Sequence, residues 1–132
     1  MSQNQKGKSK GPECCVDTVD KWGARIVFHE KHREFKSKFH KELEDLSTGG
    51  FVKKRIPDAL LDPLSVWQDL TDPKVKNYYK LYSQLNFFGN IIYNYTKVVV
   101  LTKFRPWIII SSYECQNIKE QGGSKKCLYQ KS

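Results

Sequence analysis

The sequence predicts a small α+β domain that is mostly α-helical and ends in a β-hairpin-like segment. Apolar and aromatic side chains recur at helical spacing between Asp17 and Gly50, whereas β-branched and aromatic residues dominate after Asn86. The 132 residues suffice for one domain. A hydrophobic content of 39% and a mean hydropathy of -0.63 indicate a thin core, or one that a partner completes.

The first thirteen residues are rich in Gly, Ser, Gln and Lys and are expected to form a disordered basic tail over 1–13. They contain no apolar stretch of the kind found in a secretory signal. We therefore expect an intracellular protein that is not secreted. The cytoplasm and the cytoskeleton, including a cilium or flagellum, are the expected locations.

One long basic helix is predicted from Asp17 to Gly50. Asp17 can cap its start, and the glycine pair at 49–50 supplies a stop. Its apolar stripe has steps of three, four and seven residues and consists of Phe28, His32, Phe35, Phe39 and Leu46. Trp22 and Ile26 fall on a different face, so the helix either meets two partners or bends near Gly23.

The segment after this helix is predicted to be a linker followed by two helical starts. The linker holds the basic run Lys53-Lys54-Arg55, which could touch an acidic surface or simply be solvated. Asp62-Pro63 and Asp72-Pro73 are each typical of a helix start. The first predicts one or two turns, and the second predicts a helix lined by Val75, Tyr78, Tyr79, Tyr82 and Leu85.

Three β-branched or aromatic runs follow, at 91–96, 98–102 and 107–110. The last two are predicted to pair as a hairpin, which needs a third strand, the helices or a partner to be stable. We expect one domain over 14–115 and a flexible basic tail over 116–132. The apolar stretch 91–110 contains Lys97, Lys103 and Arg105, whose cost in a bilayer argues against membrane insertion.

No catalytic motif is present, such as GxGxxG, a P-loop, HExxH or GxSxG. All three histidines lie between Asp17 and Gly50, where His29 and His32 could share one face of a zinc site with Cys14 or Cys15. The aromatic stripe explains His32 equally well. We predict a protein that is not an enzyme, with no catalytic residues, no metal and no cofactor.

The net charge of +9 and pI of about 9.4 predict an anionic partner. An acidic protein surface such as tubulin is one candidate. Nucleic acid is the other, because the tyrosines and phenylalanines of the central segment could stack on bases. The basic residues lie outside that aromatic segment, however, and no nucleic-acid-binding motif appears.

Residues 17–85 resemble the small microtubule inner proteins of ciliary and sperm-tail doublets. The likeness lies in a charged helix followed by the segment Ser65-Val66-Trp67-Gln68-Asp69-Leu70-Thr71-Asp72-Pro73, which is similar to a Ser-Trp-x-Asp…Glu-Pro segment of one such family. The resemblance implies a non-enzymatic structural or adaptor protein on microtubules. We expect partner binding through Trp22, Trp67 and Trp107 as anchors and Lys53, Lys54 and Arg55 as charges. The alternative is a small nucleic-acid-binding accessory protein.

Overall fold

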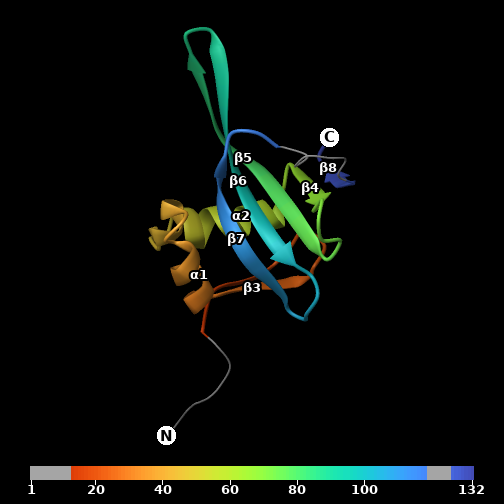
Figure 1. Cartoon of the computed structure of the whole chain (residues 1–132). Coiled ribbons are helices and arrows are strands. Elements are labelled where there is room, and N and C mark those ends of the chain that lie inside the picture. Colours follow the sequence, from red (N-terminus) through yellow and green to blue (C-terminus); the bar gives the residue numbers. More distant parts are fainter. Residues whose placement is uncertain (1–12, 119–125) are drawn as a thin grey trace, which may run out of the picture.

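The computed structural model, which describes residues 13–118 and 126–132, is mostly β (Figure 1). One mixed sheet of seven strands has the order β2-β3-β7-β6-β5-β4-β8, in which β3 and β7 are parallel and every other pair is antiparallel. The strands are β2 (Cys14–Val19), β3 (Arg25–His29), β4 (Ser65–Gln68), β5 (Val75–Phe87), β6 (Asn90–Leu101), β7 (Trp107–Cys115) and β8 (Cys127–Gln130). The helices are α1 (Glu30–Lys36) and α2 (Ile56–Leu61), with a 3₁₀ turn over Lys41–Glu44 and a π-helical turn over Phe51–Arg55.

The predicted long helix from Asp17 to Gly50 is wrong. Its first part is the antiparallel hairpin β2–β3, and only Glu30–Lys36 is α-helical. The chain turns at Gly23, which has a φ of 90° that few other residues adopt. Ile26 and Phe28 are both fully buried two residues apart, which is the period of a strand. Pairing of β3 with the distant strand β7 fixes this choice.

Both Asp-Pro helix starts are also wrong, because they precede strands β4 and β5. Tyr78 and Tyr79 are both buried, which a strand achieves by sending neighbouring side chains to opposite faces of the sheet. The Tyr78 hydroxyl donates a hydrogen bond to Asp20 Oδ2 at 2.7 Å in the core. Tyr79 belongs to the other face, together with Ser65 opposite it on β4.

The predicted hairpin of 98–102 with 107–110 is confirmed as part of the β6–β7 pairing. β5 supplies the third strand that such a hairpin needs. Within the segment expected to be a flexible tail over 116–132, residues 127–130 form β8 and pair with β4. The tail predicted over 1–13 lies outside the described residues except for Glu13.

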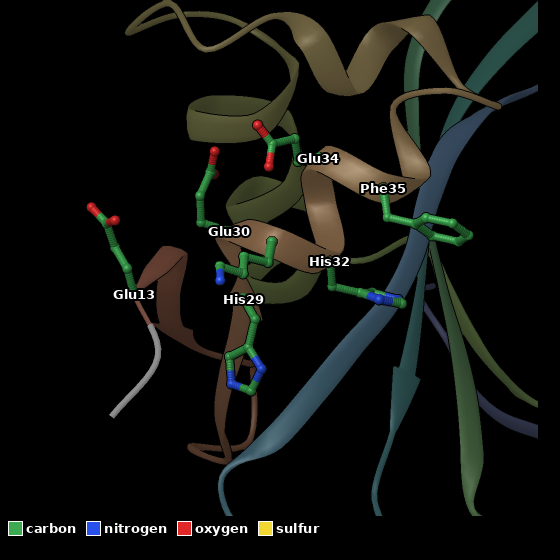
Figure 2. A pocket seen from close by; sticks show the side chains of 7 residues that line it. Glu13, His29, Glu30, His32, Glu34 and Phe35 are labelled. Carbon is green, nitrogen blue, oxygen red and sulfur yellow. The ribbon is translucent and has the colours of Figure 1, made fainter. Parts of the chain in front are cut away.

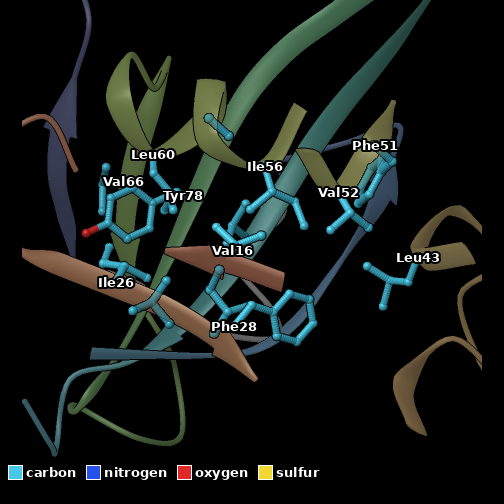
Figure 3. Packing of buried hydrophobic residues seen from close by; sticks show 14 residues of the cluster. Val16, Ile26, Phe28, Leu43, Phe51, Val52, Ile56, Leu60, Val66 and Tyr78 are labelled. Carbon is cyan, nitrogen blue, oxygen red and sulfur yellow. The ribbon is translucent and has the colours of Figure 1, made fainter. Parts of the chain in front are cut away.

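The hydrophobic core lies between one face of the sheet and a layer of short helices (Figure 3). α2 packs against β2, β5 and β6, and the π-helical turn continues its layer. Ile56 and Leu60 of α2 are fully buried against Val98 and Val100 of β6. We call this side of the sheet the covered face. The opposite side, to which Tyr79 belongs, is the open face.

Candidate functional site

The three tryptophans expected to anchor a partner lie on separate elements. Trp22 is exposed in the β2–β3 turn, with its ring centroid 5.1 Å from that of Tyr129. Trp67 on β4 is half-buried and donates its indole N–H to Ser65 Oγ at 3.0 Å. Trp107, also half-buried, begins β7 under the ammonium of Lys76. Their placement supports no shared tryptophan surface.

The basic run expected to contact a partner is divided between solvent and core. Lys53 and Lys54 are exposed, and Lys54 forms an ion pair with Asp58 at 3.1 Å. Arg55 is 9% exposed and forms an ion pair with Glu114 of β7. Arg55 therefore has a structural role on the covered face, and only the two lysines face a possible partner.

One pocket surrounds the start of α1 and has a volume of about 660 Å³. Figure 2 shows that its carboxylates and imidazoles point in different directions: Glu13, Glu30 and Glu34 lie on one side, His32 points toward the sheet and His29 points away from both. His32 Nε2 lies 2.8 Å from the carbonyl oxygen of Ile110, an acceptor that requires the proton on this nitrogen. Over residues 13–118 and 126–132, no three His, Cys, Asp or Glu side chains are placed to hold a metal ion.

A second pocket, on the open face, gathers side chains that do converge. It has a volume of about 360 Å³ and is lined by Asp69, Leu70, Thr71, Asn77, Lys97, Val99, Ser111 and Tyr113. We call it the sheet-face cleft. Strand register builds it, because Tyr79, Lys97 and Tyr113 lie directly opposite one another on β5, β6 and β7. The neighbouring row is Asn77, Val99 and Ser111.

Lys97 is the charged group at the centre of the cleft and is only 6% exposed. Its ammonium lies 5.5 Å from the ring centroid of Tyr79 and 5.3 Å from that of Tyr113, which is cation–π distance. Burial alone would lower the pKa of Lys97, but hydrogen bonding to Tyr113 and the proximity of both phenols raise it above its ordinary value. Lys97 is therefore positively charged at neutral pH.

The carboxylate nearest this cation in the cleft is already occupied by its own loop. Asp69 Oδ2 accepts hydrogen bonds from the Thr71 hydroxyl and from the backbone N–H groups of Thr71 and Asp72. Asp69 Oδ1 accepts one from the amide of Asn77 at 3.2 Å. Burial raises the pKa of Asp69, but these hydrogen bonds hold it below its ordinary value. Among the described residues, no carboxylate lies within ion-pair distance of Lys97.

Two further features complete the cleft. Asn77 is 2% exposed, and its side-chain oxygen has no hydrogen-bond partner among the described residues. Such an atom costs about 1–3 kcal/mol unless a ligand or water donates to it. The imidazole of His40 stacks on Tyr113, one of the lining residues, with centroids 4.5 Å apart and planes 17° apart. The cleft thus offers a cation beside a flat ring pair.

Sequence reasoning missed the cleft, although one signal for it exists. Lys97 is a single charge between apolar strand residues, and alternation places it on the same face as Tyr95 and Val99. An isolated lysine on a half-buried strand is an unusual choice. Its tyrosine neighbours, however, come from the register of β5 and β7, which the sequence alone does not specify.

No helix within the described ranges is long and apolar enough to cross a bilayer. Comparisons with protein-family models, with curated proteins and with solved structures found no match to this chain.

Proposed function

We propose that this chain binds single-stranded nucleic acid through the sheet-face cleft. One observation carries the proposal: the buried ammonium of Lys97 faces the cleft with no carboxylate partner among the described residues. Tyr79 and Tyr113 offset the burial of the ammonium but carry no formal charge, so a bound anion would supply the counter-ion that the described residues lack. A phosphate group of a nucleic-acid backbone is the anion that best suits a chain with a net charge of +9.

The surroundings of Lys97 favour a nucleotide chain over a lone phosphate ion. The His40–Tyr113 ring pair provides a flat surface on which a base can stack. Lys38 and Lys41 lie on either side of His40 in the sequence, and both are exposed, so they add positive charge near this ring pair.

The test is titration of fluorescent single-stranded RNA and DNA oligonucleotides, followed by anisotropy, with a matched pair of variants. Lys97→Met removes the cleft cation and keeps its length, whereas Lys53→Met removes an exposed lysine from the helical layer. Both variants lose one positive charge. A hydrogen bond to a charged group contributes about 1.5–3 kcal/mol, so Lys97→Met should weaken binding about tenfold or more.

Lys53→Met should change affinity by less than about twofold in the same titration, because an exposed charge outside the binding site is screened by salt. The salt slope should fall by about one for Lys97→Met only. Equal losses in the two variants would mean that net charge alone drives binding, and the cleft proposal would fail. Absence of binding by the unaltered protein at low salt would also overturn it.

Docking on an acidic protein polymer such as a microtubule stays a prediction. The amphipathic helix expected over Asp17 to Gly50 would have supported this role, but β2, β3 and the short helix α1 occupy that segment. Co-sedimentation with polymerised tubulin, run on the same two variants, separates the two functions. Pelleting with tubulin in the absence of oligonucleotide binding would favour the microtubule role over nucleic-acid binding.

A further inference from the structure

The outer half of the β5–β6 hairpin projects from the body of the molecule (Figure 1). β4 pairs with β5 only as far as Tyr79, and β7 pairs with β6 only from Tyr95 onward. Beyond these points the two strands pair with each other alone, and every residue from Leu81 to Tyr93 is exposed. We call residues 81–95 the arm.

The composition of the arm differs from that of the rest of the chain. No charged residue occurs between Lys80 and Lys97, although the whole chain has a net charge of +9. Large exposed apolar residues occupy most of the arm instead: Leu81, Tyr82, Leu85, Phe87, Phe88, Ile91, Ile92 and Tyr93. Leu85 and Ile92 lie opposite each other in the ladder and so form an apolar pair on one face.

The tip of the arm carries an exposed phenylalanine, Phe88, in a strained backbone conformation. Phe88 has a φ of 50° and Gly89 a φ of 79°, as in a two-residue hairpin turn of the kind that normally takes Asn-Gly. A bulky residue in this left-handed region is an outlier. The side chain of Phe88 is also 89% exposed. Neither the turn nor the core explains a phenylalanine here, whereas an interface would.

We infer that the arm is a dimerisation element, and that the arm of a second copy of this chain covers it. A two-stranded ribbon is marginal in water, and an uncharged apolar strand edge is a template for another strand. The arm has two such edges, formed by residues 83–87 and 90–94. Between its apolar residues stand exposed amides that can pair with their own copies, at Gln84, Asn86 and Asn90.

The absence of charge in the arm favours a second copy of this chain as its binding partner. An acidic partner would gain no electrostatic attraction from an arm that carries no charge. A second arm is equally apolar and equally uncharged, so the two surfaces are compatible. Two bodies of +9 repel each other, but overlapping arms hold them apart. Residues 81–87 span about 20 Å at strand spacing. This exceeds the Debye length of about 8 Å at physiological ionic strength, so the repulsion is largely screened.

Sedimentation equilibrium of the full chain, from low to high micromolar concentration, tests the inference. The unaltered protein should be a dimer at the upper end. Leu85→Lys places like charges in the arm–arm contact and should raise the dimer dissociation constant about tenfold or more. Leu46→Lys makes the same change at a leucine exposed on the body and should leave the constant unchanged.

Phe88→Asn removes the tip ring and installs the preferred turn sequence, so the hairpin itself should be retained or strengthened. It should nevertheless weaken the dimer about tenfold. The dimer should also persist at high salt, because no charge takes part in the contact. A monomer at every concentration, a dimer unaffected by Leu85→Lys, or a dimer dissolved by salt would each overturn the inference. None of these outcomes bears on the cleft, which lies on the body.

Discussion

Two neighbouring residues of β6, Thr96 and Lys97, point to opposite faces of the sheet and meet different surroundings. On the covered face, the hydroxyl of Thr96 accepts a hydrogen bond at 3.0 Å from Arg55, which is also ion-paired to Glu114 and stacked 3.6 Å from the ring centroid of Tyr82. On the open face, Lys97 meets two phenols and no carboxylate among the described residues. These two neighbours thus lead to two buried cations in contrasting surroundings, Arg55 on the covered face and Lys97 on the open face.

This comparison distinguishes Arg55, whose charge has a structural role, from Lys97, whose charge is available to a ligand. Each of the three nitrogens of the Arg55 guanidinium donates to a protein oxygen, Nη2 to Asn94 Oδ1 at 3.3 Å. The pair therefore stabilises the junction of the π-helical turn, β6 and β7. The ammonium of Lys97 has two phenols but no carboxylate beside it in a cleft, so it can still pair with a bound anion.

The largest change in stability is expected from a substitution on the covered face. Arg55→Met should lower the free energy of unfolding by about 2 kcal/mol, because it leaves Glu114 without its cation and opens the stack with Tyr82. The loss stays near this value because the Glu114 side chain is 38% exposed and can be rehydrated. Urea unfolding followed by circular dichroism measures it.

The adjacent Lys54→Met is the control for Arg55→Met. Its ion pair with Asp58 is exposed, so its loss should cost less than about 0.5 kcal/mol. Equal effects of the two substitutions would contradict the distinction between a buried structural cation and an exposed one.

Lys97→Met should have a smaller effect than Arg55→Met. The substitution removes the contacts of the ammonium with Tyr79 and Tyr113 but leaves no carboxylate without its cation, so the free energy of unfolding should fall by less than about 1 kcal/mol. The same urea titration measures this change, with Lys53→Met as the reference. A loss as large as that of Arg55→Met would mean that Lys97 is a structural residue like Arg55.

The β-rich end of the chain was predictable because its signal is local. Runs such as Val98-Val99-Val100 combine β-branching with a charged turn before Trp107, and the β6–β7 hairpin follows. The first half was not predictable in this way. The stripe from Phe28 to Phe39 has helical spacing, but α1 ends at Lys36, and Arg25–His29 takes its strand form from the parallel pairing with β7.

The cleft was beyond prediction for a related reason. Tyr78 and Tyr79 share one side of the helix expected after Asp72, but in β5 they point to opposite faces. The row formed by Tyr79, Lys97 and Tyr113 requires the registers of two strand pairs, and each register depends on packing across the whole sheet. The arm could be predicted in part, because the sequence shows directly that no charged residue lies between Lys80 and Lys97.

The smallest expected effect uses Cys115 as a reporter of the charge on the open face. Burial raises the pKa of the Cys115 thiol, and the positive charge of Lys97 partly opposes this shift. Because the thiolate is the reactive form, removing the ammonium should make Cys115 still less reactive at a given pH. In Lys97→Met, the pH profile of its iodoacetamide alkylation, resolved by peptide mass spectrometry, should move to higher pH.

The exposed Cys127 provides the internal reference for this experiment, since it lies on β8 and should alkylate at the same rate in both proteins. Cys15 provides a second one, because burial raises its pKa to about 12 and should keep it slow throughout. A Cys115 profile that does not move would show that the ammonium of Lys97 is neutralised or turned away from the open face. In that case Lys97 would resemble Arg55, and the contrast between the two faces would be lost.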